Sequence, residues 1–434
     1  MSIRSRLWHK IVIVVGLFII LYNPPILPFN AMHVVGIISL GVLVVFYPKR
    51  LQNVVRGEGE TATKVAYLVL GITVMLMYNI MVGIANNSLK SGNIAESVYY
   101  LLDVIPFSIL LTTYCNRENY QAKDYFDLLL LAGYIQAILA IAAFFIEPLK
   151  IWFNRRLAIY GYASIDILVQ HRNYGFAGTL TFATPVIQSI FSLIAIYQGI
   201  TKSKKYFFGA ILLFFSAVIN ARTSLIVLCI GIIFLFVRSQ LSLKKKVSML
   251  GCFIIFCLFV SLFFPVLLKY APATFRWIED GIKEIEMLLE GNTEDGTFSI
   301  LLDPEWYKVP SGMQFVFGTG HTVMTGYDGY NSDIGYINDI WFGGIFYILI
   351  KYVFVYALLV YIIRKNKEDL FRYIGILFMI LLPILNIKGQ AFIMSGFINM
   401  IFIMFFICIS LHVNGCVQET QRFDGFSVIK NAGY

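Results

Sequence analysis

Long apolar segments alternate with short polar ones along the whole chain. Each apolar segment is about as long as a membrane-spanning helix, which needs roughly 20 residues to cross a bilayer core. The alternation of apolar and polar residues that is typical of membrane β-barrels is absent, so helices must satisfy the backbone in lipid. The pattern therefore predicts an all-α, polytopic membrane protein with about twelve transmembrane helices, at residues 10–27, 31–47, 64–84, 97–113, 125–146, 174–199, 205–220, 222–237, 247–268, 335–363, 369–386 and 391–412.

The composition excludes a water-soluble domain. Of the 434 residues, 59% are hydrophobic and only 14% are charged, whereas a soluble domain carries roughly 25% charged residues. The formal net charge is +9, but no basic cluster with interleaved aromatic residues forms a nucleic-acid face. Most of the 34 lysines and arginines fall in segments on the same side as the N-terminus. This bias predicts an inner-membrane protein with a cytoplasmic N-terminus and no nucleic-acid partner.

The helix pattern and this orientation divide the chain into four parts. Residues 1–268 hold the first nine helices and an outward loop at 147–173, and residues 269–334 form the largest outward loop. Residues 335–412 hold the last three helices, and residues 413–434 form a cytoplasmic tail. Apolar residues at helical spacing in the largest loop predict an amphipathic helix with an acidic wet face at the outer interface. These residues are Phe275, Ile278, Ile282, Ile285 and Leu289.

Motifs for nucleotide, metal or serine chemistry are missing. The chain has no P-loop, no GxSxG, no HExxH and no GxGxxG between a strand and a helix. We therefore expect no metal and no cofactor. The outer side of the membrane supplies no ATP, so an enzyme acting there needs a substrate that carries its own activation. A lipid-linked pyrophosphate is such a substrate.

Arginines on the outward side are the main candidates for substrate binding. The positive-inside rule disfavours basic residues there, so their presence needs a reason. Arginine presents a planar, permanently charged fork that binds phosphate oxygens through two parallel hydrogen bonds. The outward arginines are Arg155, Arg156, Arg172, Arg222 and Arg276.

These arginines differ in how far a structural role explains them. Arg155 and Arg156 can extend along the interface, and Arg276 can pair with a glutamate of its own helix. Arg222 lies in a helix hairpin whose turn is too short to leave the membrane region, so it must face an interior cavity or a partner. Arg172 directly precedes a predicted helix. We expect Arg222 and Arg172 to contact substrate.

Several residues can accept a proton from a sugar hydroxyl. Asp333 stands at the membrane boundary before the tenth helix, where burial and a nearby arginine tune a carboxyl pKa; its alternative role is to cap that helix. His171 and His321 are further candidates because histidine is a common general base, although a loop histidine is commonly only a solvated polar residue. Asp339 is a second acid candidate, and we expect Lys351 to pair with a carboxylate or to line a cavity.

Three short motifs and the helix layout carry a family resemblance. The motifs are NARTS at 220–224, FGTG at 317–320, and SDIGYI at 332–337 followed by GGIFY at 343–347. Together with a modest outward loop in the middle and a larger one late, they resemble bacterial O-antigen polymerases of the Wzy type, in the superfamily that includes O-antigen ligases. In the ligases a histidine or an asparagine-like residue heads the last segment. Asp333 stands here instead, which favours a polymerase.

The resemblance implies a metal-independent membrane glycosyltransferase of the GT-C type, whose periplasmic loops form the site. Such an enzyme moves a growing glycan from undecaprenyl pyrophosphate to the non-reducing end of a new lipid-linked repeat unit. A protein that regulates chain length is a further implied partner. The residues implied to hold the pyrophosphate are Arg222, Arg172, Arg276 and Arg156. The implied candidate bases are Asp333, His321 and His171.

Other functions fit parts of the same pattern. An O-antigen ligase would transfer the glycan to a lipid A core, so exchange of the acceptor lipid in vitro distinguishes it. A polysaccharide flippase or exporter, which is not an enzyme, usually carries its charges within helices and lacks a long outward loop. A structural scaffold would need no arginine in a turn at membrane level.

Overall fold

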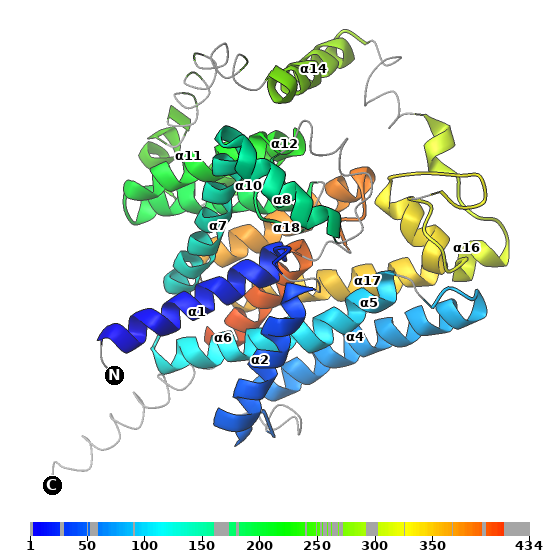
Figure 1. The fold of residues 1–434 in the computed structure, drawn as a ribbon, viewed down its shortest axis with the longest axis horizontal. Helices are drawn as coiled ribbons and strands as arrows, with labels where there is room; N and C mark the ends of the chain where they lie inside the picture. The colour runs from blue at the N-terminus through cyan, green and yellow to red at the C-terminus, as the bar shows by residue number, and fades with distance from the viewer. Residues whose placement is uncertain are drawn as a thin grey trace.

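The chain is almost entirely helical where the structure describes it. The computed structural model describes residues 3–26, 30–49, 51–52, 60–89, 92–159, 173–178, 182–238, 241–248, 250–251, 254, 258, 262, 268, 272–291, 303–324, 326–366, 368–392 and 396–411. Its labelled helices are α1 (Ile3–Tyr22), α2 (Ala31–Phe46), α4 (Glu60–Ala85), α5 (Gly92–Tyr99), the π-helical turn η1 (Tyr100–Val104), α6 (Ile105–Arg117), α7 (Ala122–Phe145), α8 (Glu147–Ile159), α10 (Ala183–Thr201), α11 (Lys205–Val218), α12 (Thr223–Arg238), α14 (Pro272–Leu289), the 3-10 turn η2 (Pro304–Tyr307), α16 (Met313–Phe317), α17 (Gly335–Lys365) and α18 (Asp369–Lys388). Within these ranges no strand forms (Figure 1).

Among the residues that the structure describes, six helices are long and apolar enough to cross a membrane. They are Ala62–Ala85 in α4, Gly92–Arg117 through α5, η1 and α6, Ala122–Phe145, Ala183–Thr201, Gly335–Lys365 and Asp369–Lys388. The shorter apolar helices are Leu7–Tyr22, Ala31–Phe46, Lys205–Val218, Thr223–Val237 and Gly396–Leu411. These helices confirm the prediction of an all-α membrane protein, while the full number of spans stays a prediction. The predicted helix at 247–268 lies mostly outside the described residues, and the tail at 413–434 lies wholly outside them.

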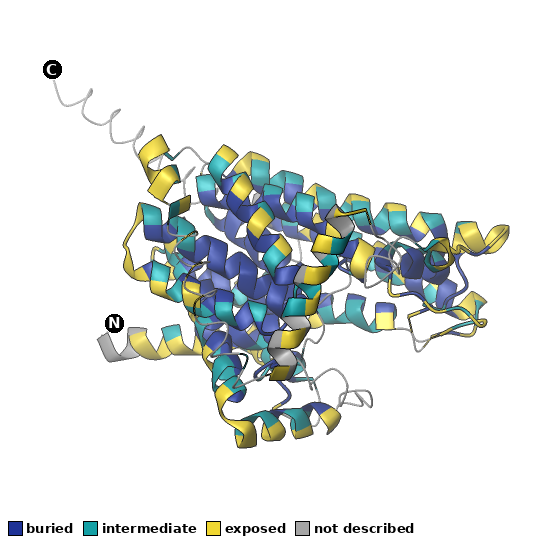
Figure 2. Ribbon diagram, turned by 90° about the horizontal axis from the view of Figure 1, so that it is seen from above, coloured by how far each residue is buried: buried dark blue, intermediate teal, exposed yellow. Residues whose placement is uncertain are grey.

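The outside of the bundle is apolar. Phe208 is 80% exposed and Ile37 is 70% exposed, although large apolar side chains of soluble proteins are usually buried. Figure 2 shows the buried residues gathered inside the bundle and the exposed ones along its rim. Lipid tails solvate such a surface as well as a protein interior does, because they are equally apolar.

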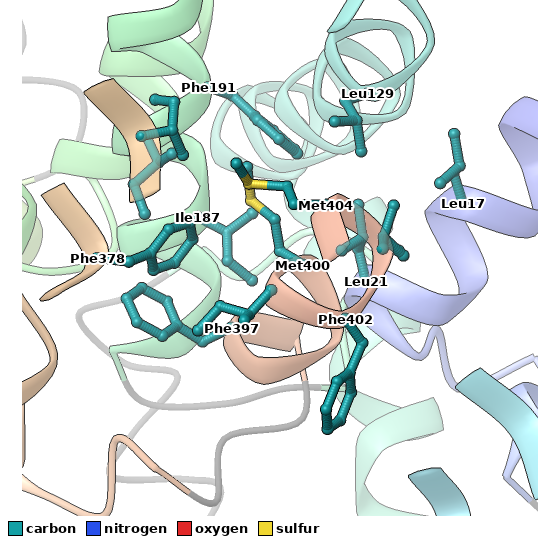
Figure 3. Packing of buried hydrophobic residues seen from close by; sticks show 14 of the residues in the cluster. Leu17, Leu21, Leu129, Ile187, Phe191, Phe378, Phe397, Met400, Phe402 and Met404 are labelled. Atoms are coloured by element: carbon teal, nitrogen blue, oxygen red, sulfur yellow. The ribbon is translucent and has the colours of Figure 1, made fainter. Parts of the chain in front are cut away.

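The centre of the bundle is formed by α10 and the helix Gly396–Leu411. Within α10, 83% of the apolar stretch is buried, against 33% in α4. Ile187 and Phe191 of α10 lie in one cluster with Phe378 of α18 and with Phe397 and Met400 of the last helix (Figure 3). Dense packing at this crossing holds the helix ends that form the candidate site.

The sequence predicts one continuous helix over 335–363, but α17 is broken within this range. Gly344 has φ 68° and ψ −169° and breaks it. Across the break, the Lys351 Nζ donates to the Asp339 Oδ1 at 2.6 Å, and the two side chains are 1% and 0% exposed. These residues would lie roughly 18 Å apart along a straight helix, so the first half of α17 folds back against the second. The predicted pairing of Lys351 with a carboxylate is confirmed.

Removing one partner of this pair is expected to destabilise the protein. Lys351→Met leaves the Asp339 carboxylate buried without its countercharge, which costs about 3–5 kcal/mol of folding free energy. In the wild type, the Tyr352 hydroxyl donates to the Asp339 Oδ2 at 2.9 Å. A double variant that adds Asp339→Asn keeps an amide oxygen that accepts this hydrogen bond, so we expect it to recover most of the lost stability. Thermal unfolding of the detergent-solubilised proteins measures both effects. A double variant as unstable as the single one would show that charge pairing is not what stabilises the fold here.

Candidate functional site

The turn between α11 and α12 is held from two sides. The Asn220 Nδ2 donates to the Ser216 carbonyl at 2.7 Å, and the Asn220 Oδ1 accepts from the Asn173 backbone N–H at 2.8 Å. Both asparagines are buried. The segment 173–178 is therefore attached to the turn, and the backbone that carries Arg222 is rigid.

Arg222 extends from this turn to α14. Its Nη1 lies 3.1 Å from the Glu284 Oε1, and the two side chains are 20% and 16% exposed. The prediction that Arg222 faces a partner or a cavity is thus confirmed, and the partner is a carboxylate. Beside the guanidinium, at the first residue of α12, the buried Thr223 hydroxyl has no hydrogen-bond partner among the described residues. The turn therefore combines a permanent positive charge with an unused donor.

The ends of three helices meet at one end of the bundle, and one of these helices, α10, also contacts α12. In α10, the Ser189 hydroxyl donates to the Ser224 carbonyl of α12 at 3.3 Å. Phe182, directly before α10, lies against Gly389, where an added Cβ would be 2.5 Å from the phenylalanine ring. Gly335, at the start of α17, lies against the Gly389 carbonyl. The start of α10, the start of α17 and the end of α18 therefore share one end of the bundle.

Asp333 lies at this junction, directly before α17, and its side chain is exposed. The pKa of the Asp333 carboxyl is raised from its ordinary value because neighbouring protein atoms displace water from it, and the Lys388 ammonium opposes part of this shift. Ile334, rather than Asp333, is the cap residue of α17, and its side chain makes no capping bond. The alternative explanation of Asp333 as a helix cap is therefore wrong, and its carboxylate remains available for chemistry.

The FGTG motif closes the break in α17. The Thr319 N–H donates to the Trp341 carbonyl at 2.7 Å, and the Gly320 N–H donates to the Phe342 carbonyl at 2.9 Å. The Tyr78 hydroxyl donates to the next carbonyl, that of Gly343, at 2.7 Å. Carbonyls freed by a helix break at membrane depth must find partners inside the protein. The motif that supports the family resemblance thus has a structural role.

His321 follows this motif and stacks on the Tyr327 ring, with the ring centres 4.5 Å apart. It is half-buried. Figure 1 shows this loop beside α16 and α17, whereas α14 lies beside α12. His321 is thus held by the loop on α17.

The other predicted arginines are less engaged. Arg155 is exposed on α8, and the neighbouring Arg156 places its guanidinium carbon 5.6 Å from the centre of the Trp152 ring. Both positions fit anchoring at an interface. Arg276 is exposed on α14. His171 and Arg172 lie outside the described residues.

One buried carboxyl group and its histidine partner were not predicted. The His33 Nδ1 lies 2.6 Å from the Asp103 Oδ2, and Asp103 is 1% exposed. Asp103 belongs to η1, and Gly36 permits the close approach of α2, because a Cβ there would lie 2.6 Å from the Asp103 Cα. An acidic residue inside an apolar segment was a usable signal. The sequence did not reveal His33 as the partner of Asp103, because a π-helical turn shifts the register of the side chains around it.

The geometry defines an all-helical membrane protein with a paired arginine at a buried helix turn. In comparisons with known proteins, the chain matches no family model, no curated protein and no solved structure. Its function must therefore be argued from the site itself.

Replacing the glycine at the break of α17 is expected to disrupt this end of the bundle. Gly344 has a positive φ, and a Cβ there would overlap the Val316 carbonyl, so Gly344→Ala costs at least about 1–3 kcal/mol. Gly41→Ala in α2 is the matched control, because nothing lies within 4 Å of its added Cβ. Thermal unfolding in detergent compares them. Equal stability of the two variants would contradict the description of the break.

Proposed function

We propose that the protein is a membrane glycosyltransferase of the O-antigen polymerase type. It transfers a growing glycan from a polyprenyl pyrophosphate to a hydroxyl at the non-reducing end of a second lipid-linked repeat unit, at the periplasmic face of the inner membrane. The observation that carries the proposal is Arg222, a guanidinium at a buried helix turn that already holds an acidic oxygen at 3.1 Å. A phosphate oxygen is the ligand that this fork binds equally well.

The reaction makes one bond and breaks one. The acceptor hydroxyl oxygen attacks the anomeric carbon of the donor, and the bond from that carbon to the pyrophosphate oxygen breaks. The electron pair leaves with the pyrophosphate, and the hydroxyl proton passes to a base. Arg222 stabilises the negative charge that develops on the leaving group. The Thr223 hydroxyl, which has no partner in the part of the chain that the structure describes, adds a donor beside it.

Asp333 is the base we favour. It stands at the end of the bundle where α10, α17 and α18 meet, it is exposed to substrate, and burial on one side raises the pKa of its carboxyl. A raised pKa makes a carboxylate a stronger base. His321 remains the alternative among the described candidates, but stacking on Tyr327 holds its ring in place.

Two other functions share part of this site. A ligase uses the same pyrophosphate donor, so Arg222 does not distinguish it, and Asp333 in place of a histidine favours the polymerase. A flippase or exporter also needs an anion site but no base. Loss of polymer after a change at Asp333 therefore separates an enzyme from a carrier.

Arg222→Ala is expected to abolish long-chain polysaccharide while the protein still accumulates in the membrane. Removing a charged donor that contacts the leaving group slows such reactions by roughly 10²–10³-fold. Arg222→Lys keeps the charge but loses the planar fork, so we expect it to restore activity only in part. The measurement is the chain-length ladder of surface polysaccharide in a deletion strain that expresses each variant.

Arg155→Ala is the matched control, because Arg155 is an exposed arginine of α8. It should support a normal ladder. A normal ladder from Arg222→Ala at wild-type protein levels would refute the proposed site.

Activity is expected to fall on acidification because Asp333 must be ionised to accept a proton. Its raised pKa means that protonation, and with it loss of the base, sets in at a higher pH than for an ordinary aspartate. Polymerisation of a lipid-linked repeat unit by purified protein, followed from neutral to mildly acidic pH, measures this. Asp333→Asn should be inactive throughout. Asp328→Asn, in the exposed turn nearby, should keep the wild-type pH profile. If Asp333→Asn is active and has the same pH profile as the wild type, Asp333 is excluded as the base.

A further inference from the structure

The guanidinium of Arg222 is already occupied. Its partner, Glu284, belongs to α14, and neither side chain is more than one-fifth exposed. A carboxylate and a phosphate present the same kind of charged oxygen to an arginine fork. Two anions on one guanidinium repel each other, so a pyrophosphate that binds Arg222 competes with Glu284.

α14 covers the stem of Arg222 as well as its head group. Gly281 lies against the arginine, and a Cβ added there would be 2.5 Å from the Arg222 Cδ. Glu284 follows Gly281 by three residues and therefore projects from the same face of the helix. One face of α14 thus has a gap for the arginine chain and, one turn later, a carboxylate for its charge. Figure 1 shows α14 above α12, at the top edge of the bundle.

The remaining charges of α14 are mostly acidic. Its glutamates and aspartate outnumber Arg276 and Lys283, and Glu279 pairs with Lys283 at 2.9 Å. A helix of this charge attracts no pyrophosphate of its own. It stays at the turn because of Arg222, and it repels a competing anion that reaches that residue.

We propose that α14 is an autoinhibitory lid whose Glu284 occupies Arg222 until the pyrophosphate of the donor lipid displaces it. This inference rests on the proposed function. The lid keeps the arginine neutralised when no donor is present, and donor binding releases α14 from the turn. Only the part of the population with an open lid binds the donor, so the lid weakens apparent affinity by that fraction.

A different account of the same contact predicts the opposite result. If the pair only anchors α14 and orients Arg222 for binding, removal of the carboxylate misplaces the guanidinium and weakens binding of an anion. If Glu284 is a competitor, its removal strengthens binding. The sign of the change decides between them.

The experiment measures binding of inorganic pyrophosphate to the purified full-length protein by titration calorimetry. We expect Glu284→Gln to lower the dissociation constant by roughly tenfold, as for a lid closed about nine-tenths of the time. Gly281→Leu, which forces α14 away from the arginine stem, should lower it as well. Glu286→Gln is the matched control, because Glu286 is exposed and two residues further along the helix; it should bind as the wild type does.

Each outcome is informative. If either Glu284→Gln or Gly281→Leu binds pyrophosphate no more tightly than wild type, the lid is overturned. Arg222→Ala serves as the reference for the site itself. If Arg222→Ala abolishes binding while Glu284→Gln changes nothing, only the lid hypothesis is refuted. If Arg222→Ala binds pyrophosphate as the wild type does, the proposed function loses its anion site and the lid hypothesis is refuted with it.

Discussion

The requirement that carbonyls and charges buried in the membrane find partners governs this structure. Water cannot compensate an unpaired carbonyl or charge there, so each one must be matched within the protein. Lys351 and Asp339 show the strength of this constraint, because twelve residues of one helix separate them and yet they touch. The helix breaks at Gly344 so that they can meet, and the carbonyls freed by the break are taken up by Thr319, Gly320 and Tyr78.

The break also determines where the candidate site lies. Because the first half of α17 folds back, its start at Gly335 comes to rest on the end of α18 at Gly389. Asp333 thereby lies near Lys388, at the end of the bundle where α10 begins. A straight helix would carry Asp333 beyond this junction. The buried ion pair and the exposed carboxylate are therefore parts of one arrangement, although only the second has a proposed chemical role.

The sequence carried enough information for the helices and for two of the charged side chains. Apolar length alone marked the spans, because a bilayer imposes a minimum length. The cost of an isolated charge in lipid predicted that Lys351 would pair and that Arg222 would face a partner. The break in α17 was not predictable in the same way, because the Gly343–Gly344 pair is compatible with a continuous membrane helix. Its geometry depends on the FGTG loop, which is distant in sequence from the ion pair it helps to form. Glu284 was predicted only as part of an acidic wet face, since periodicity tells which face is polar but not which residue reaches another helix.

The same constraint explains why the resting site should be occupied. A guanidinium at a buried turn cannot stand without a counterion, and a substrate is bound for only part of each cycle. Glu284 satisfies this need in the structure. A carboxylate suits the role because it carries a single charge, whereas a pyrophosphate carries more and offers more oxygens to the same fork. Under the proposed function, Glu284 binds strongly enough to neutralise Arg222 and weakly enough to yield to the donor. A polyanion-binding site in apolar surroundings is therefore more stable, when it is empty of ligand, if a carboxylate of the protein occupies it.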